Sequence, residues 1–281
     1  MANLFSGLEA FGLGDLSEMN VYEDKEKDEA QKVALDEKGN SVEKDLLFDK
    51  TFTCPVCDKE FKTKMVKTGK GKLLSLDTDL RPRYQSMDPL KYDAIVCPHC
   101  GFAALTRFFK YVTTSQIGLI KKNISAVFKG LKESGEVFDY DEAINRHKLA
   151  LVNAIVKKSK ISERAYTCLK TAWVLRGKAE ELPTDTPDYD KVLQGIGNEE
   201  KEFLTKAYDG FVEAVGKELF PMCGMDETTL DILMADLARR IGRYDEAGRI
   251  ISKILISKNA NERIKNKARD IKELIKEVKN Q

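Results

Sequence analysis

Two Cys-Pro-x-Cys pairs, Cys54/Cys57 and Cys97/Cys100, are the residues of this chain whose type and spacing indicate chemistry. A Cys-x-x-Cys unit forms a tight turn that directs two sulfur atoms toward one point, and two such units complete a tetrahedron around a metal ion. Four protein ligands leave no open position for a substrate, so the ion is expected to be structural. The pairs predict a four-thiolate site with zinc as its cofactor.

The cysteines alone leave iron open as an alternative, because rubredoxin-like sites use the same four ligands. Zinc is favoured because the sequence contains no redox-cofactor motif. His99 lies between Cys97 and Cys100. Four thiolates already complete the coordination shell, so we expect no ligand role for this histidine.

No catalytic constellation accompanies the predicted metal site. Cys168 lies in an apolar helical stripe and is expected in the core, and His147 is expected to pack within a helix interface. Cys223 would need a base within reach to act as a nucleophile, and His99 and His147 are the two histidines of the chain. The sequence has no phosphate loop, dinucleotide fingerprint or serine elbow. These observations favour a protein that is not an enzyme and leave an unrecognised activity open.

The segment between the cysteine pairs carries more charged and aromatic residues than a connecting loop needs. Pro82 and Pro89 restrict its backbone, and rigid arginine and tyrosine side chains are strong binding anchors. An alternative is that Asp77 and Asp79 pair with the arginines and brace the module. Our prediction is a recognition surface beside the metal, formed by Arg81, Arg83, Tyr84, Asp88 and Tyr92.

Four sequence motifs in this region occur together. They are Cys-Pro-x-Cys at Cys54–Cys57, Leu-Arg-Pro-x-Tyr at Leu80–Tyr84, Asp-Pro-Leu-Lys-Tyr-Asp at Asp88–Asp93 and Cys-Pro-x-Cys-Gly at Cys97–Gly101. With them the chain resembles a bacterial family catalogued only as a domain of unknown function. The resemblance extends from about residue 45 to the end of the chain. It implies an N-terminal four-cysteine zinc ribbon followed by tetratricopeptide-like helices, and it implies no activity.

Alternating apolar residues predict β-strands on both sides of the first cysteine pair and before the second. Phe52, Phe61 and Met65 alternate with polar residues, and Ala94 and Val96 lead into the second pair. Strand, knuckle, strand is the layout of a zinc ribbon. We place this domain at residues 46–110, after an acidic segment at residues 1–45 that is expected to be mobile because it has little to bury.

Residues 111–281 are predicted to form a helical, tetratricopeptide-like domain. The sequence Tyr-Asp-Glu-Ala occurs at Tyr140–Ala143 and at Tyr244–Ala247, close to three tetratricopeptide periods of about 34 residues apart. A small-large-small pattern, which lets helices approach closely, follows at three places. Its members are Ala143, His147 and Ala150; Ala207, Phe211 and Ala214; and Ala247, Ile251 and Ile254. The predicted fold class is α+β, with the small β module packed on a mainly α-helical array.

Individual helices follow from apolar periodicity and capping residues. A first helix is expected to begin at Phe102 and a second to be capped by Ser115. Prolines and glycines between Glu181 and Asn198 predict a long loop. The later helices are expected at Ser162–Lys178, Glu227–Ile241 with Asp226 as its cap, Asp245–Ser257 and Glu262–Val278.

Composition narrows the classes of partner and compartment. The 281 residues suffice for about two domains, and a net charge of +1 with 33% charged residues requires neither nucleic acid nor a membrane surface. No apolar run reaches the roughly 18 to 20 residues of a membrane span. Six cysteines without a disulfide framework indicate a reducing compartment, so we expect a cytoplasmic protein.

Two functions agree with these features. The first is a zinc-binding adaptor or scaffold that mediates protein–protein interaction, with a protein or peptide held in a groove around Glu163, Tyr166, Lys170 and the Asp231–Arg239 face. The alternative is a nucleic-acid-binding zinc-ribbon regulator, in which ribbon lysines contact phosphates and Tyr84 or Tyr92 stacks on a base. Those lysines are Lys59, Lys62, Lys64, Lys67, Lys70 and Lys72.

Overall fold

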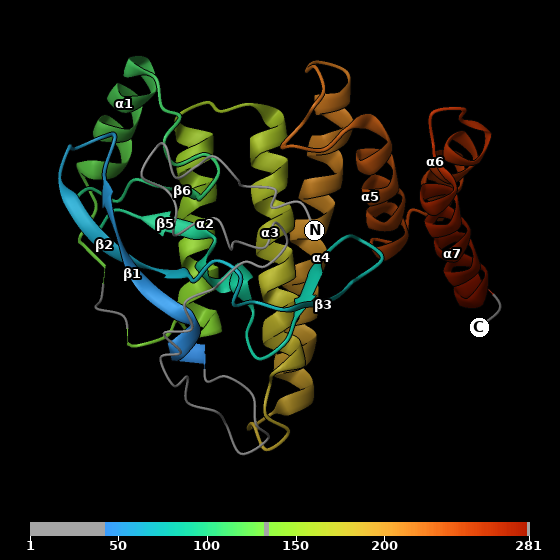
Figure 1. Ribbon diagram of the computed structural model, residues 1–281, viewed down its shortest axis with the longest axis horizontal. Coiled ribbons are helices and arrows are strands. Elements are labelled where there is room, and N and C mark those ends of the chain that lie inside the picture. The colour runs from blue at the N-terminus through green and yellow to red at the C-terminus, as the bar shows by residue number, and fades with distance from the viewer. Residues whose placement is uncertain (1–42, 132–134, 280–281) are drawn as a thin grey trace, which may run out of the picture. The chain divides into compact units, whose positions relative to one another are not determined.

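Residues 43–131 and 135–279 are described by a computed structural model and belong to one compact unit (Figure 1). Strands occupy its N-terminal part and helices the remainder, which confirms the α+β class. The predicted acidic segment lies outside the described residues except for residues 43–45. The division into a domain at 46–110 and another at 111–281 stays a prediction.

The strands form three separate two-stranded antiparallel hairpins in the described part of the chain. Along β2, outward Lys62 alternates with buried Phe61 and Thr63, as expected for a ribbon covered on one face. The hairpins are β1 (Leu47–Thr53) with β2 (Glu60–Val66), β3 (Leu73–Leu76) with β4 (Pro82–Tyr84), and β5 (Ala94–Val96) with β6 (Ala103–Leu105).

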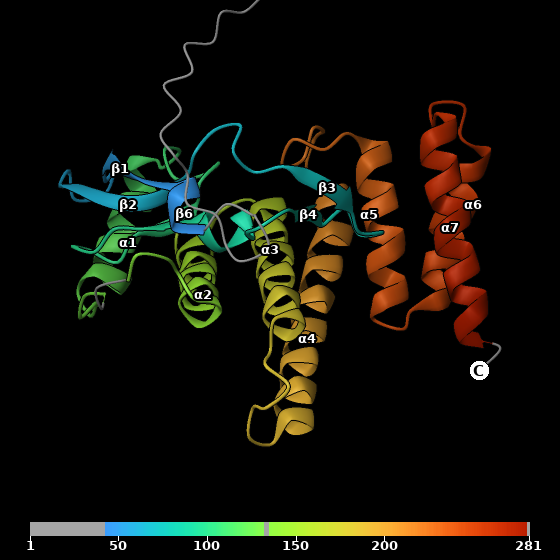
Figure 2. The same cartoon turned by 60° about the horizontal axis from the view of Figure 1, so that its bottom comes forward.

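Most helices follow the strands in sequence (Figures 1 and 2). They are α1 (Thr114–Ile120), α2 (Tyr140–Val156), α3 (Ile161–Glu180), α4 (Tyr189–Val215), α5 (Glu227–Arg240), α6 (Tyr244–Ile256) and α7 (Glu262–Lys279), with short 3-10 helices at Glu43–Leu46 and Pro89–Tyr92 and a π-helical turn at Lys121–Ser125. Helices α3, α5, α6 and α7 confirm four predicted helices to within two residues. Asp226 caps α5 as predicted, because its side chain accepts a hydrogen bond from Thr229 N at 2.7 Å.

Two predictions about the chain after the second cysteine pair are wrong. Phe102 does not begin a helix, because the next three residues pair with β5 as strand β6. Ser115 is not the cap of α1. Thr113 takes that position and forms a capping box with Gln116, in which each side chain accepts from the other residue's backbone N–H.

The predicted long loop before residue 198 is also wrong. Helix α4 already begins at Tyr189, and Gly195 and Gly197 lie within it on its exposed side. Glycine weakens a helix by about 1 kcal/mol relative to alanine. The opposite side of α4 buries Leu204 and Phe211, and this tertiary burial outweighs the local preference.

The repeated Tyr-Asp-Glu-Ala sequence begins α2 in one copy and α6 in the other. All nine small-large-small residues predicted from the sequence are buried, so the pattern identified the packed sides of α2, α4 and α6. Helix α4 has 27 residues, however, and therefore breaks a 34-residue period. Kinship with tetratricopeptide repeats stays a prediction.

Hairpin β5–β6 lies between the cysteine cluster and helix α2. Ala94 and Val96 pack with Ala150 of α2, whereas Ile95 points to the opposite side and joins the apolar cluster around the cysteines. Figure 1 shows β5 and β6 next to α2, and Figure 2 shows the same for β6. Because successive side chains of β5 point to opposite sides, this strand packs against the predicted metal site on one side and against α2 on the other.

Candidate metal centre

Each cysteine pair lies at the turn of an antiparallel hairpin, the first between β1 and β2 and the second between β5 and β6. Both turns close in the same way. The backbone N–H of Cys54 donates to Lys59 O at 3.0 Å, and that of Cys97 donates to Phe102 O at 2.8 Å. The two sequence motifs thus build the same knuckle twice, which explains why each presents two sulfur atoms on one side.

The residue after each pair adopts a left-handed backbone conformation. Asp58 has φ of 59° and Gly101 has φ of 73°. A Cβ atom added to Gly101 would lie 2.6 Å from the ring of Phe128, whereas Asp58 carries its side chain outward. The left-handed conformation favours glycine in the second knuckle, and the contact with Phe128 requires it.

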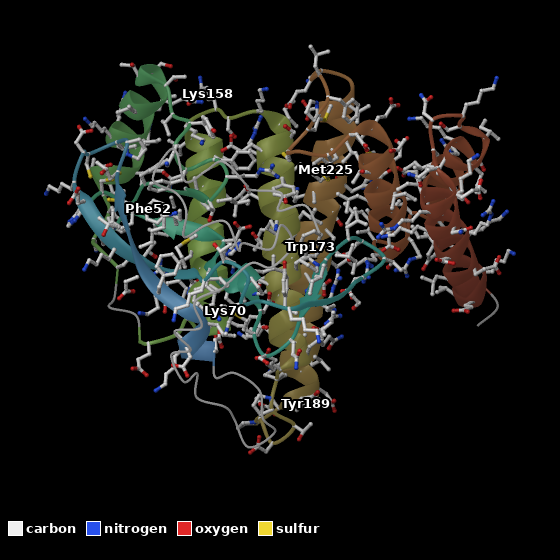
Figure 3. The ribbon with its side chains drawn as sticks, viewed as in Figure 1. Phe52, Lys70, Lys158, Trp173, Tyr189 and Met225 are labelled. Atoms are coloured by element: carbon white, nitrogen blue, oxygen red, sulfur yellow. The ribbon has the colours of Figure 1, made fainter. Side chains whose placement is uncertain are left out.

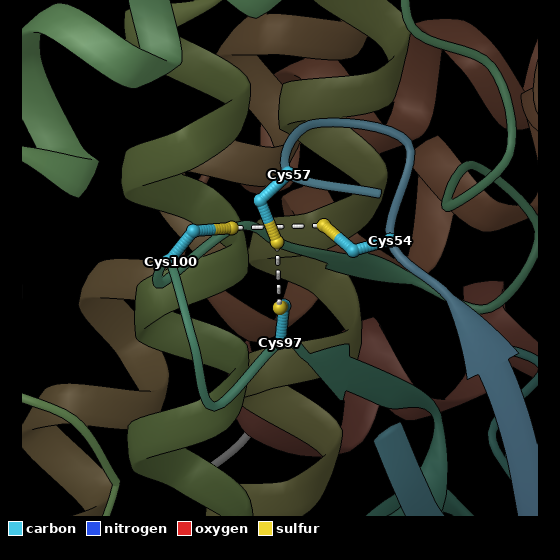
Figure 4. A group of neighbouring side chains, drawn as sticks. All are labelled: Cys54, Cys57, Cys97 and Cys100. Carbon is cyan, nitrogen blue, oxygen red and sulfur yellow. Dashed lines mark hydrogen bonds between the residues drawn. The ribbon is translucent and has the colours of Figure 1, made fainter. Parts of the chain in front are cut away.

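The four sulfur atoms form one cluster (Figure 4). All lie within 4.8 Å of one another, with 3.6 Å between Cys54 Sγ and Cys100 Sγ and 3.7 Å between Cys57 Sγ and Cys97 Sγ. With Zn–S bonds of about 2.3 Å, tetrahedral geometry places sulfur atoms about 3.8 Å apart. The cluster therefore has the dimensions that a single zinc-sized ion requires.

Backbone N–H groups point toward the sulfur atoms. Val56 N lies 3.4 Å from Cys54 Sγ, and the N–H groups of His99 and Cys100 are directed at Cys97. Four thiolates around a divalent cation carry a net charge of about −2, and N–H dipoles stabilise that charge. The donor set fits a thiolate-bound metal ion.

Proximity of the thiol groups changes their proton affinities. The hydrogen bond between Cys97 and Cys100 is the main cause that lowers the pKa of Cys97. The hydrogen bond between Cys54 and Cys100 is the main cause that raises the pKa of Cys54. Crowded thiols therefore keep their remaining protons tightly in the absence of a cation. A metal ion binds thiolates and releases those protons.

Aromatic rings enclose the cluster on its inner side. Phe109 contacts Phe52 and Phe102 with ring-centroid distances of 5.7 and 5.1 Å. Cys57 is half-buried, and the other three cysteines of the cluster are buried. An apolar wall on a closed set of four ligands suits a structural ion.

The remaining cysteines show no activation. Burial raises the pKa of Cys168 to about 12 and that of Cys223 to about 11. Cys168 lies in the helical core as predicted, and Cys223 donates to Ser162 O at 3.3 Å. Neither thiol is in the state that a nucleophile needs.

The two histidines also lie outside the metal cluster. His99 Nε2 lies 3.2 Å from Glu60 O and is absent from the group of potential ligands found among the described residues. His147 is fully buried, with Nδ1 at 2.8 Å from Ala143 O, which confirms its packing role. Burial lowers the pKa of His147, so this side chain is neutral.

The five residues predicted as a recognition surface do not share one exposed face. Arg81 is only 3% exposed and Tyr92 only 2%. Tyr92 stacks on Phe138 and donates to Glu43 Oε1 at 2.7 Å. Their burial contradicts the expected exposure of these two side chains. Arg81, Arg83, Tyr84 and Asp88 do border one cavity of about 320 Å³, and their binding role stays a prediction.

The alternative of a brace accounts for the arginine contacts. Arg83 donates to Asp77 Oδ1 at 2.7 Å and through both terminal nitrogens to Glu180, at 2.5 and 2.7 Å. Arg81 Nη1 reaches the same Glu180 at 2.9 Å. Bidentate arginine–carboxylate pairs fix geometry strongly. The segment between the cysteine pairs is thus attached to the end of α3.

A second set of ionic contacts was not found by sequence reasoning. Asp79 is fully buried and accepts from Arg176 at 2.7 Å and from Trp173 Nε1 at 3.0 Å (Trp173 is labelled in Figure 3). Burial alone would raise the pKa of Asp79, but Arg176 lowers it below its usual value. The sequence showed these charges but not their pairing, because the partners lie on distant elements.

The same network extends to helix α5. Asp236 is also fully buried and accepts from Arg240 Nε at 2.7 Å and from Thr78 Oγ1 at 2.7 Å. We call the contacts made by residues 77–83 with Trp173, Arg176, Glu180, Asp236 and Arg240 the insert–helix network. It holds the loop between β3 and β4 against α3 and α5.

The structure shows contacts at two other predicted binding features, the groove around Lys170 and the lysines of the ribbon. Lys170 is not a free groove residue, since it pairs with Asp93 at 3.3 Å, and residues 232–238 of α5 are buried. Of the six ribbon lysines, Lys64 pairs with Asp49 and Lys67 donates to Asp45 O. Nucleic-acid binding stays a prediction.

Across residues 43–131 and 135–279, no helix has both the length and the apolar character of a membrane span.

Comparison with known proteins gives one match. Residues 47–275 match a family described as "Uncharacterized protein conserved in bacteria (DUF2225)". No curated protein and no solved structure matches the chain. The matched region contains both knuckles, the insert–helix network and most of the helices, and it covers well over half of the chain. The resemblance inferred from the motifs is confirmed, and the chain belongs to this bacterial family of uncharacterised proteins.

Proposed function

We propose that this protein is a non-enzymatic adaptor, in which Cys54, Cys57, Cys97 and Cys100 bind one structural zinc ion and the helices hold a protein or peptide partner. Zinc is chosen over iron because the donor set is closed and no group for electron transfer accompanies it in the sequence. The adaptor role is supported by one observation in particular, a groove on the helices.

The groove has a volume of about 570 Å³ and is formed by one side each of α2, α3 and α4. Leu151 and Ile155 contribute from α2, Ile161 and Ala165 from α3, and Phe203 from α4. Ile155 is 53% exposed. Exposed apolar side chains that line a concave surface are typical of a binding site. We refer to this surface as the helical groove.

The zinc centre supports one wall of this groove. Asn153 of α2 is buried and donates to the carbonyl oxygen of Gly101 in the second knuckle at 3.0 Å. Its neighbours in sequence, Leu151 and Ile155, line the groove. A metal ion that fixes the two knuckles would therefore also fix α2 and the shape of the groove.

Metal analysis tests the first half of the proposal. Purified protein is expected to contain one zinc per chain, and Cys97→Ser is expected to lose it, while Cys168→Ser keeps it as the matched control. Protein that contains iron in place of zinc, or a Cys97→Ser variant with full zinc content, would contradict this part.

Site-specific photo-crosslinking tests the second half. A photoreactive amino acid at Ile155 or Phe203 is expected to crosslink to discrete partner polypeptides in bacterial cells. The same amino acid at exposed Lys201, on α4 but outside the groove lining, is the control. Equal crosslinking from the control position would argue against an adaptor groove.

A further inference from the structure

The charged residues around the helical groove differ in whether they are already neutralised. Glu199 pairs with Lys148 at 2.5 Å, and Glu213 pairs with Lys217 at 2.6 Å. Arg164 and Lys206 line the groove and have no ion pair among the described residues.

The charges of these two cations act on groove residues. The hydrogen bond from Lys217 is the main cause that lowers the pKa of Glu213, and Arg164 adds to it. Burial raises the pKa of Cys168, and Lys206 opposes that rise. Glu202 is a single unpaired carboxylate on the same surface. Of the three charged lining residues without an ion pair in the described structure, two are therefore positive.

The lining residues repeat with helical spacing. On α4 they extend from Glu199 to Glu213, a distance of about 21 Å at 1.5 Å per residue. On α3, Ile161, Ala165 and Cys168 follow the same i, i+4, i+7 pattern. The apolar lining comes mainly from α2 and α3 with Phe203 of α4, and charged α4 residues border it. A groove of this length and composition matches about four turns of another, amphipathic helix.

The backbone of the walls favours a helical occupant over an extended one. Helices α2, α3 and α4 satisfy their own backbone groups, so they offer no strand edge with which an extended peptide could pair. A helix brings its N–H and C=O groups already bonded and presents only side chains to the groove.

From the spacing and the unpaired cations we infer that the helical groove binds an amphipathic helix of a partner protein, whose apolar stripe is bordered by carboxylates facing Arg164 and Lys206. This inference rests on the proposed adaptor function and specifies the chemistry of the partner. The apolar stripe supplies most of the affinity, and the carboxylates select the partner and its orientation.

Two designed peptides test this partner chemistry. Both are fluorescein-labelled amphipathic helices of about four turns with leucines at i, i+3, i+4 and i+7, and their apolar stripe is bordered either by glutamates or by lysines. Fluorescence anisotropy at about 0.1 M salt is expected to show roughly tenfold tighter binding of the glutamate peptide, since 1.4 kcal/mol corresponds to a factor of ten.

Charge reversal provides the decisive comparison. Arg164→Glu combined with Lys206→Glu is expected to invert the preference, so that the lysine peptide binds more tightly. Lys201→Glu combined with Arg263→Glu changes the net charge by the same amount at exposed positions outside the groove lining, and it is expected to leave the preference unchanged. Equal inversion by both double variants would assign the effect to overall charge and overturn the proposal.

Photo-crosslinking reports where the peptide binds. A photoreactive amino acid at Ile155 is expected to crosslink the glutamate peptide at least fivefold more than the same amino acid at Lys201, which is exposed on α4 outside the groove lining. Binding without this difference would place the peptide elsewhere, and failure of both peptides to bind would reject the amphipathic helix. If groove crosslinks to partner polypeptides persist in that case, the adaptor function stands and only its partner chemistry is wrong.

Discussion

The residue that follows each cysteine pair has the same backbone conformation in both knuckles but a different side chain. Asp58 and Gly101 are left-handed, yet only Gly101 also faces another side chain, the ring of Phe128. The cysteine spacing identifies the four candidate metal ligands, but it does not show which knuckle tolerates change. That asymmetry comes from packing that lies outside the motif.

Gly101→Ala is expected to destabilise the protein by about 2 kcal/mol or more, because left-handed strain of about 1 kcal/mol adds to overpacking against Phe128. Asp58→Gly is the matched control and is expected to change the free energy of unfolding by less than about 1 kcal/mol. Urea unfolding of zinc-loaded protein measures both. Similar losses for the two variants would show that the contact with Phe128 is unimportant.

Because His147 is buried, the free energy of unfolding is expected to depend on pH. Nδ1 donates to Ala143 O, so Nε2 carries the lone pair, and this nitrogen is buried without a partner in the described structure. Burial lowers the pKa of His147 in the folded chain below the value of about 6.5 expected for this side chain in the unfolded chain. The unfolded chain therefore binds a proton that the folded chain does not, and stability decreases as pH falls through 6.5.

The loss attributable to this group approaches about 1.4 kcal/mol per pH unit below that value. His147→Leu is expected to remove this component of the slope between pH 7 and 5.5. Protonation of metal ligands contributes equally to both proteins, so the difference between their slopes is the quantity to measure. Identical slopes would mean that His147 accepts a proton in the folded state.

At the scale of elements, the insert–helix network joins the β3–β4 hairpin to α3 and α5. Asp79→Asn removes one buried charge and leaves Arg176 partly unpaired, although Glu200 still accepts from it at 2.7 Å. Breaking one side of a buried ion pair typically costs about 3 to 5 kcal/mol, so a loss near 3 kcal/mol is expected.

Asp49→Asn is the control for that variant. Asp49 pairs with Lys64 at 3.1 Å on the surface of the ribbon, where such pairs contribute less than about 1 kcal/mol. Thermal and urea unfolding of both variants make the comparison. A small effect at Asp79 would show that the network orients the hairpin without stabilising the fold.

The elements predicted correctly from the sequence depend on local patterns, whereas those that were missed depend on contacts with residues far away in the chain. The ribbon strands and helices α3, α5, α6 and α7 carry periodic apolar patterns that their own residues reveal. The first part of α4, up to residue 198, was missed because Gly195 and Gly197 argue locally against a helix that distant packing enforces. Arg81 was assigned to a surface because its partner Glu180 lies far away in sequence.

At the scale of the whole molecule, the metal centre and the helical groove are connected through α2. Removing the metal with a chelator is expected to increase amide hydrogen exchange in residues 94–105 and along α2, where Asn153 contacts Gly101. Residues of α6 and α7 belong to the helical core cluster and not to the cluster around the cysteines, so their hydrogen exchange serves as the internal reference. Unchanged exchange in α2 would separate the metal from the groove.

The hydrogen bond between Thr78 and Asp236 joins residues that are 158 positions apart. During synthesis both knuckles can close once residue 102 has left the ribosome, whereas the contact of the β3–β4 loop with Asp236 must wait for α5. Asp79 remains a solvated carboxylate until α3 supplies Arg176 and Trp173. The order of translation thus makes the attachment of the N-terminal β3–β4 loop dependent on helices that are made much later.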